Sequence, residues 1–395
     1  MATGSMIRVL HVISSLDGRA GGPTTVVKGI AIAQAKSGLN VTVISTYSAG
    51  DDTIASKAMQ DAGVRVQLIG PAVGRLMLHR EIRLRIEEAV SQAEIVHIHA
   101  IWEDIQRRAA ITSRKQGVPY VITPHGMLTS WSLSQSKWLK HLFLALRVKR
   151  NLSHASAIHF TSESERDASL VLRIPTIIES IGLDLTEFVD LPPKGTFRSL
   201  HPQTLGKPLI IFLGRIHPGK GLEHLIPALM HSEASDAILV IIGPDSENFK
   251  AVIDEMVVRF GLQNRVIFTG MLRGAQKVAA LSDGDLFCLP SDHENFGLSI
   301  VEALAAGLPV VLSRHVGIWR EIIDAGLGGV ADQDAESLGQ EIAVWLRDPA
   351  RRRAAADKAR PFVWKKYDWL PIAERWRGHY TEVINLELAE KLKLQ

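Results

Sequence analysis

The chain lacks the features that mark secreted, membrane-spanning and nucleic-acid-binding proteins. Its single cysteine, Cys288, lies in an apolar segment, so no disulfide framework can form and we expect a reducing compartment, the cytoplasm. No uninterrupted apolar stretch approaches the ~20 residues that a bilayer-spanning helix needs, and no signal peptide precedes the first expected strand. Lysine and arginine total 45 against 42 acidic residues, and a net charge of +3 is too small to indicate a nucleic-acid partner.

What is present is the alternation of strands and helices typical of two α/β domains. At 395 residues the chain can hold two separate cores, and residues 1–5 resemble a cloning remnant that we leave out of the fold. Residues 191–208 have the proline, glycine and polar composition of a linker. We therefore expect a first domain over residues 6–195, a second over 205–370 and a C-terminal segment over 371–395.

Hydrophobic patterning predicts a doubly wound order of strands in both halves. In the first half the expected strands are Ile7–Ile13, Asn40–Ser45, Arg65–Ile69, Ile95–Ile98, Tyr120–Thr123 and Ala157–Phe160, with helices from Thr24, Ile54, Ile82, Ile105 and Leu139. In the second half they are Leu209–Leu213, Ile238–Ile242, Arg265–Phe268, Leu286–Leu289 and Val310–Leu312.

Two glutamates, Glu294 and Glu302, bracket a turn between a buried strand and an apolar helix. At the helix start, the backbone N–H groups of Gly297, Leu298 and Ser299 lack intrahelical partners, and the helix dipole favours an anion there. A glutamate about one turn inside the helix can accept hydrogen bonds from hydroxyls beside a phosphate. The segment therefore indicates phosphate together with polyol, the chemistry of a sugar nucleotide. A polar turn without any ligand is the alternative.

A second motif places two cations on a loop bounded by glycines. Arg215 and Lys220 are five residues apart between Gly214 and Gly221, directly after the uncharged strand Leu209–Leu213. Both side chains can converge on one diphosphate, the arginine through its planar fork and the lysine as a point charge. The alternative is a pair of solvated loop cations.

Together these motifs resemble those of the retaining glycosyltransferases of GT-B fold, in the large family marked by an E-x7-E motif. Thr123–Leu133 is similar to the subset that builds bacterial surface polysaccharides, and the resemblance runs from Met6 to about Tyr380. The matching positions are Glu294 and Glu302 for the E-x7-E motif, Gly214, Arg215, Lys220 and Gly221 for the G-R-x4-K-G element, and Gly21 and Gly22 for the glycine pair after the first strand.

The resemblance implies an α/β architecture of GT-B type. Two Rossmann-like doubly wound domains would face each other across a cleft, the first on the acceptor side and the second binding the nucleotide-sugar donor. The C-terminal helix, residues 371–395, would cross back to the first domain. Ligands of open α/β sheets lie at the carboxyl ends of the strands, so the donor is expected between the domains.

The resemblance also implies roles for single residues. Arg215 and Lys220 would neutralise the departing nucleoside diphosphate, and Glu294 would act at the donor sugar, near His125. The N–H groups at the start of the helix would hold phosphate oxygens, and Glu302 the ribose hydroxyls. The complete set of implied donor contacts is Gly21, Gly22, Gly243, Met271, Gly297, Leu298, Ser299 and Glu302.

Several histidines and aspartates leave alternatives open. His125 either bonds a sugar hydroxyl or caps a turn. His97 and His99 alternate on one strand like a metal pair, but without a nearby cysteine or carboxylate we prefer His99, with Trp102, on the acceptor side. Two D-x-D patterns, 283–285 and 332–334, look like turns rather than metal sites, so we expect neither metal nor other cofactor.

The expected activity is retaining transfer of a hexose from a nucleotide sugar, with a UDP-sugar favoured over a GDP-sugar, to a hydroxyl of a lipid-linked glycan. Alternatives are transfer to a small soluble acceptor such as a sugar phosphate, a GT-B epimerase, or a sugar-nucleotide-binding protein without turnover. A dinucleotide-dependent oxidoreductase is disfavoured, because no G-x-G-x-x-G follows the first strand.

The stretch from Leu128 to His154 contains no acidic residue and mixes basic residues with tryptophan and leucine. This composition suits reversible docking on an anionic membrane surface, the inner face of the cell membrane. An amphipathic helix packed on the first sheet is the alternative. The residues concerned are Trp131, Lys137, Trp138, Lys140, His141, Leu142, Phe143, Leu144, Leu146, Arg147, Lys149 and Arg150.

Overall fold

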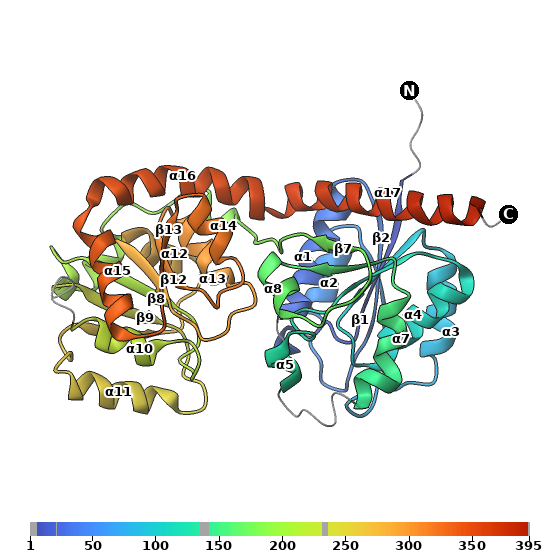
Figure 1. The fold of residues 1–395 in the computed structure, drawn as a ribbon, viewed down its shortest axis with the longest axis horizontal. Coiled ribbons are helices and arrows are strands. Elements are labelled where there is room, and N and C mark those ends of the chain that lie inside the picture. Colours follow the sequence, from blue (N-terminus) through green and yellow to red (C-terminus); the bar gives the residue numbers. More distant parts are fainter. Residues whose placement is uncertain (1–5, 21, 135–141, 231–235, 394–395) are drawn as a thin grey trace. The chain divides into compact units, whose positions relative to one another are not determined.

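The computed structural model describes residues 6–20, 22–134, 142–230 and 236–393, and the chain divides into two compact units. The first unit comprises Met1–Gly182 and Trp369–Gln395, and the second comprises Leu183–Asp368. Each unit is built around its own parallel sheet with helices packed against it (Figure 1). The expected α/β architecture of two Rossmann-like domains is confirmed.

The first unit holds a seven-stranded sheet in the order β3-β2-β1-β4-β5-β6-β7, and every pair is parallel. The strands are β1 (Arg8–Ile13), β2 (Asn40–Thr46), β3 (Arg65–Ile69), β4 (Ile95–His99), β5 (Tyr120–Thr123), β6 (Ala157–Phe160) and β7 (Thr176–Ile178). The helices are α1 (Gly22–Lys36), α2 (Ile54–Asp61), α3 (Ile82–Ser91), α4 (Asp104–Gln116), α5 (Ser130–Ser134), α7 (Lys149–Ser153), α8 (Glu163–Ala168) and α17 (Trp369–Lys393).

Two separate apolar cores cover this sheet. Side chains of α3, α4 and α7 pack on one face, and those of α1, α2 and α17 pack on the other. The strands must therefore be apolar on both sides, which is why they read as continuous apolar runs in the sequence. A polar exception is the row of histidines on β1 and β4, where His11 lies beside His97 in the parallel register.

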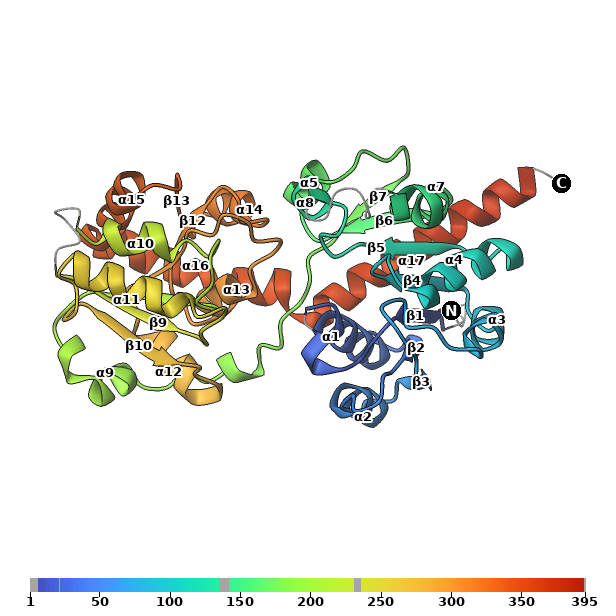
Figure 2. The same ribbon diagram turned by 90° about the horizontal axis from the view of Figure 1, so that it is seen from below.

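The C-terminal helix α17 belongs to the first unit and follows α16 of the second (Figure 2). Trp369, its first residue, is held between two glycines of the first unit. A Cβ atom at Gly29 would lie 2.2 Å from the indole ring, and one at Gly182 would lie 2.3 Å from it. Only glycine at both positions leaves room for the ring. The expected return of the C-terminal helix to the first domain is thus seen.

The second unit holds a six-stranded parallel sheet in the order β10-β9-β8-β11-β12-β13. The strands are β8 (Leu209–Leu213), β9 (Ile238–Ile242), β10 (Val266–Gly270), β11 (Leu286–Leu289), β12 (Val310–Ser313) and β13 (Gly328–Ala331). The helices are α9 (Thr196–Leu200), α10 (Leu222–Ala228), α11 (Phe249–Arg259), α12 (Gly274–Asp283), α13 (Leu298–Ala305), α14 (Trp319–Asp324), α15 (Ala335–Arg347) and α16 (Pro349–Tyr367).

The boundary between the units differs from the linker expected over residues 191–208. That stretch packs on the second unit, where the carboxylate of Asp283 accepts hydrogen bonds from the N–H groups of Gly195 (2.6 Å) and Phe197 (2.7 Å). Asp285 likewise pairs with Arg198 at 2.9 Å. The second unit therefore begins at Leu183. The two aspartates of this D-x-D pattern thus bind backbone N–H groups and an arginine side chain.

Candidate functional site

In the second unit, two loops meet beyond the carboxyl ends of β8 and β11. Gly221 has a left-handed conformation (φ 77°), and a Cβ atom there would lie 2.1 Å from the carbonyl oxygen of Pro290. The backbone N–H of Asp292 donates to the carbonyl of Gly219 at 3.0 Å. Glycine is required for so close an approach. The loop with Lys220 and the loop with Glu294 are consequently held against each other.

Lys220 and Glu294 form an ion pair across these loops. The ammonium nitrogen lies 2.5 Å from a carboxylate oxygen, and the side chains are 19% and 21% exposed. The backbone of Glu294 is fixed as well, because its N–H donates to His315 at 3.1 Å and its carbonyl accepts from Gly317 at 2.7 Å. The structure thus joins two residues that are 74 positions apart in the sequence.

Arg215 lies on the same loop as Lys220 but is exposed. No other described residue forms a hydrogen bond or ion pair with it. Its loop is positioned by a glycine contact, since a Cβ atom at Gly243 would lie 1.9 Å from the carbonyl oxygen of Gly214. The close contact at Gly243 therefore requires glycine. Met271, the other expected donor contact in this part of the second unit, is 52% exposed.

Helix α13 begins at Leu298 after Gly297, which is left-handed (φ 92°) and would bring a Cβ atom within 2.6 Å of Ile300. No side chain caps this N-terminus, so Leu298 and Ser299 are at the position that favours an anion. The helix spans Leu298–Ala305.

Glu302, inside α13, is already paired with a cation that the sequence analysis did not single out. Lys277 of α12 lies 2.8 Å from Glu302 and 3.1 Å from Glu187. Burial acts to lower the pKa of Lys277, but the two carboxylates outweigh it and raise the pKa overall. A ligand hydroxyl at Glu302 would therefore join a fixed ion pair rather than a solvated carboxylate.

In the first unit, His125 follows β5 in a left-handed conformation (φ 51°), which is uncommon for a residue other than glycine. The turn is held by the buried carboxylate of Glu165, which accepts from the N–H of Gly126 at 2.6 Å and from that of Thr161 at 2.7 Å. Burial, with a contribution from His159, lowers the pKa of His125 to about 3. Sequence reasoning missed Glu165, whose local signal is the S-x-x-E spacing from Ser162, the N-cap residue that accepts from the Glu165 N–H.

The expectation that His99 lines an acceptor site needs correction. His99 is 1% exposed, and its ring nitrogens lie 2.9 Å from His11 and 3.2 Å from His125. It is thus buried beneath His125. His97 and His99 do point the same way, with ring centroids 4.2 Å apart. Trp102 is partly buried and packs against Phe143.

Ring nitrogens of His11, His97 and His99 lie within 4.8 Å of one another, as metal ligands would. Each of these rings, however, already hydrogen-bonds through both nitrogens to neighbouring side chains. Burial lowers the pKa of all three, so they are neutral. The cluster is satisfied without an ion.

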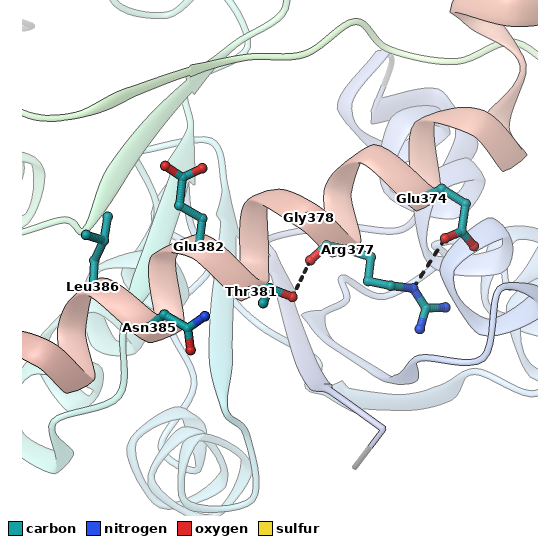
Figure 3. Close-up of a pocket in the computed structure, with 7 residues that line it drawn as sticks. All are labelled: Glu374, Arg377, Gly378, Thr381, Glu382, Asn385 and Leu386. Carbon is teal, nitrogen blue, oxygen red and sulfur yellow. Dashed lines mark hydrogen bonds and ion pairs between the residues drawn. The ribbon is translucent and has the colours of Figure 1, made fainter. Parts of the chain in front are cut away.

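Two expected donor contacts remain, Gly21 and Gly22. Gly22 begins α1, and no heavy atom lies within 4 Å of a Cβ atom placed there. The protein itself therefore leaves space at this position. Gly21 lies outside the described residues. Another pocket is lined by residues of α17 alone, among them Glu374, Arg377 and Thr381 (Figure 3).

Comparison with known proteins agrees with this division into two units. A family model described as "Glycosyl transferase 4-like domain" matches residues 21–177, and one described as "Glycosyl transferases group 1" matches residues 195–362. The first match lies within the first unit and the second within the second. The chain therefore carries two glycosyltransferase-type domains in succession, one in each unit.

Two curated relatives and one solved structure illustrate the likeness. The GDP-mannose:cellobiosyl-diphosphopolyprenol alpha-mannosyltransferase of Xanthomonas campestris is 25% identical over 386 residues, 95% of this chain and 96% of that protein. The phosphatidyl-myo-inositol mannosyltransferase of Mycobacterium leprae is 32% identical over 219 residues, 52% of this chain and 56% of that protein. The structure of Anabaena Alr3699/HepE in complex with UDP superposes with a TM-score of 0.75 at 19% identity, covering 95% of this chain and all of that one, and so shares the fold.

Proposed function

We propose that the protein is a retaining hexosyltransferase that moves a sugar from a nucleoside diphosphate to a hydroxyl of a lipid-linked glycan. The observation that carries the proposal is the charged group of the second unit. Lys220 and Glu294 are paired at 2.5 Å beside the uncapped start of α13, and Arg215 precedes Lys220 on the same loop. Two cations on one loop, together with the N–H groups of a helix start, suit a diphosphate leaving group.

The reaction follows from these groups. The bond between the anomeric carbon and the β-phosphate oxygen breaks, and the acceptor oxygen bonds to the same carbon on the same face. The departing phosphate takes the proton of the acceptor hydroxyl. Arg215 and Lys220 neutralise the charge that develops on the diphosphate, while Glu294 acts on the donor sugar. No protein nucleophile is needed.

The proposed donor nucleotide rests on a relative that is similar over nearly the whole chain. The relative from Xanthomonas campestris, aligned over nearly its whole length, is named as using GDP-mannose. This favours GDP-mannose, whereas the sequence analysis favoured a UDP-sugar. Thermal-shift measurements with GDP, UDP, GDP-mannose and UDP-glucose separate the two, because a ligand at 100 times its Kd adds ~2.7 kcal/mol of stability.

Turnover tests the proposal itself. The full chain with GDP-mannose or UDP-glucose and a polyprenyl-diphosphate-linked oligosaccharide should give an elongated glycan, whose new linkage keeps the anomeric configuration of the donor by NMR. Lys250→Ala is a matched control for charge loss, since Lys250 also forms an ion pair, with Asp254 at 2.6 Å. Binding of donor without transfer to any lipid-linked acceptor, or inversion at the anomeric carbon, would refute the proposal.

Metal independence is part of the proposal, because cationic side chains already supply the charge that a divalent ion would provide. The carboxylates of one D-x-D pattern bind backbone N–H groups, and Asp334 of the other caps α15. Transfer should continue at an unchanged rate in excess EDTA. Loss of activity in EDTA, restored by manganese or magnesium, would disprove this part.

A lipid-linked acceptor makes docking on an anionic membrane relevant. Trp131, Leu142 and Leu146 are 55%, 46% and 75% exposed, whereas Leu144 and Val148 are buried in the core. The helical stretch before α7 thus has both an inner and an outer apolar face. Lys137, Trp138, Lys140 and His141 lie outside the described residues. The outer face adjoins a basic groove lined by Arg107, Ile111, Arg114, Lys115, Leu146, Arg147, Arg150, Asn151 and His154.

Liposome sedimentation tests the docking. We expect binding to vesicles with anionic lipid that falls as salt rises, and that weakens when Lys115, Lys149 and Arg150 are replaced by glutamine. Glutamine at Lys57, Arg65 and Arg83, exposed cations elsewhere in the first unit, is the charge-matched control. Equal binding to neutral and anionic vesicles would contradict it. Among the described residues, no helix is long and apolar enough to span a bilayer.

A further inference from the structure

A chain of buried hydrogen bonds runs through the first unit and ends at a backbone carbonyl. His159 on β6 contacts the carbonyl oxygen of Glu179 through Nε2 at 2.7 Å, and its Nδ1 lies 2.7 Å from the hydroxyl of Thr123. The same hydroxyl lies 2.6 Å from Nε2 of His97, whose Nδ1 lies 2.7 Å from the hydroxyl of Tyr380 on α17. These groups come from β5, β6, β4 and the C-terminal helix.

The chain continues from Tyr380 to His125. The amide nitrogen of Gln34 on α1 lies 3.2 Å from the Tyr380 hydroxyl, and its amide oxygen lies 2.8 Å from Nε2 of His11. Nδ1 of His11 then lies 2.9 Å from Nε2 of His99, and Nδ1 of His99 lies 3.2 Å from Nε2 of His125.

The carbonyl at the end fixes the direction of the first hydrogen bonds, because it can only accept. A neutral imidazole has one donor and one acceptor nitrogen. His159 must therefore donate through Nε2 and accept through Nδ1 from the Thr123 hydroxyl. That hydroxyl accepts from Nε2 of His97, and Nδ1 of His97 accepts from the Tyr380 hydroxyl. The tyrosine oxygen is left to accept from the N–H of Gln34.

The amide of Gln34 extends the same order of donors and acceptors to His11. With its N–H turned to Tyr380, its oxygen faces His11 and requires a proton on Nε2 of that ring. His11 then accepts through Nδ1 from His99, and His99 accepts through Nδ1 from His125. Burial lowers the pKa of His11 and of His159 to about 4, which keeps the rings neutral and the sequence of donors and acceptors intact.

We propose that this chain fixes His125 as the tautomer protonated on Nε2, so that its Nδ1 is presented to the ligand only as a hydrogen-bond acceptor. No described residue hydrogen-bonds that Nδ1, and His125 is half-buried at the carboxyl end of β5. An acceptor nitrogen binds a hydroxyl and repels a phosphate or carboxylate oxygen. That the hydroxyl belongs to a sugar rests on the function proposed above.

The inference makes Tyr380 and Gln34 positioning residues that act on His125 through His11 and His99. Without the Tyr380 hydroxyl, the amide of Gln34 can turn over and donate to Nε2 of His11. Every later hydrogen bond would then reverse, and His125 would carry its proton on Nδ1. A residue of the C-terminal helix thus selects which group His125 offers.

Tyr380→Phe tests this, with Tyr120→Phe as its control. Tyr120 is also a buried tyrosine of the first unit, but its hydroxyl donates to the carbonyl of Asn151 at 2.7 Å and is not part of the chain of hydrogen bonds. Two-bond 15N–1H correlation NMR of the full chain labelled in histidine reports each tautomer. We expect His125 protonated on Nε2 in the wild type and in Tyr120→Phe, and a Nδ1-protonated population in Tyr380→Phe.

The His99 variants test the same link if Tyr380→Phe does not fold. Asparagine at 99 can keep an acceptor near the position of Nδ1, whereas glutamine places its amide near Nε2. Neither amide spans from His11 to His125, so both His99→Asn and His99→Gln should give a population of His125 protonated on Nδ1. Donor KM should rise about tenfold wherever the tautomer is lost, as expected for one unmade hydrogen bond.

Three results would overturn the inference. The first is a wild-type His125 that is protonated on Nδ1 or on both nitrogens near neutral pH. The second is an unchanged tautomer of His125 in Tyr380→Phe and His99→Gln. The third is stoichiometric binding of zinc by His11, His97 and His99. The NMR result needs no turnover. If the tautomers are as expected and no nucleotide sugar is used, the proposed function fails while the hydrogen-bonded chain stands.

Discussion

The two units share one strand order but place opposite chemistry at the carboxyl ends of their strands. In the second unit the polar groups are charged and paired, Lys220 with Glu294 and Lys277 with Glu302. In the first unit they are neutral imidazoles joined by hydrogen bonds, with the pKa of each lowered by burial. The same topology therefore supports an electrostatic site in one unit and an uncharged, directional site in the other.

Under the function proposed above, this difference would match the two parts of a sugar nucleotide. A diphosphate carries charge that grows as it departs, and preorganised cations stabilise that charge. A hexose is uncharged and is distinguished by the direction of its hydroxyl groups, which hydrogen bonds of fixed polarity can read. We therefore predict that substitutions that remove charge lower turnover most in the second unit. Acidification should lower the stability of the first unit more than that of the second.

The largest effect is expected from Lys220→Ala and Arg215→Ala. Each should lower turnover by roughly 10² or more, because each removes a cation from the leaving diphosphate. Steady-state kinetics with saturating donor measures the loss, and circular dichroism checks that the fold is retained. Lys250→Ala should leave turnover unchanged. Wild-type turnover in both site variants would remove the electrostatic assignment of the second unit.

A smaller and divided effect is expected from the two glutamates. Glu294→Gln should lower transfer by about tenfold or more while leaving the affinity for the free nucleoside diphosphate nearly unchanged. Glu302→Ala should weaken nucleotide binding, because the ribose loses an acceptor and Lys277 keeps only Glu187 as partner. Titration calorimetry with GDP and UDP separates the two. Equal loss of affinity in both variants would mean that the glutamates share one role.

The fold was predictable to a large extent because its strands are apolar throughout and its helices begin and end with local signals. The strands that sequence reasoning missed are β7 and β13, one at an edge of each sheet. β7 has only three residues. β13 begins with Gly328 and Gly329, where a Cβ atom would meet Val310 at 2.1 Å and Glu341 at 1.9 Å. Close packing demands glycine there, whereas strand propensity disfavours it.

The candidate site was predictable only where its residues are neighbours in the sequence. The loop motifs containing Arg215, Lys220 and Glu294 are local patterns. Glu165, Lys277 and Tyr380 act through partners that only folding brings near, such as Gln34, which is 346 positions from Tyr380. His99 was assigned to a ligand from its place at a strand end, but the sequence alone does not say that another histidine covers it. Tertiary contact, not composition, decides these roles.

The smallest effect is a loss of folding stability in acid. We expect it mainly in the first unit, because its buried histidines are neutral. The pKa of His11 and of His159 is about 4 in the folded protein against 6.5 for an ordinary histidine, and burial also depresses those of His97 and His99. Between pH 6.5 and 4 the unfolded chain binds protons that the folded chain does not. Stability is therefore present above pH 6.5 and is lost as the pH falls below it, by about 1.4 kcal/mol per pH unit for each such group.

Calorimetric unfolding at pH 7 and pH 5 measures this loss. The transition of the first unit should move down by several degrees, at about 2–4 °C per kcal/mol, and further than that of the second unit. Among the described histidines of the second unit, His293, half-buried beside Glu294 and Lys220, has a pKa that burial lowers. His11→Gln keeps an amide in the hydrogen-bonded chain and removes one titrating group, so proton uptake on unfolding near pH 5 should fall by about one. If the second unit unfolds first on acidification, the histidines of the first unit are not buried in neutral form, and the contrast between a charged and an uncharged site does not hold.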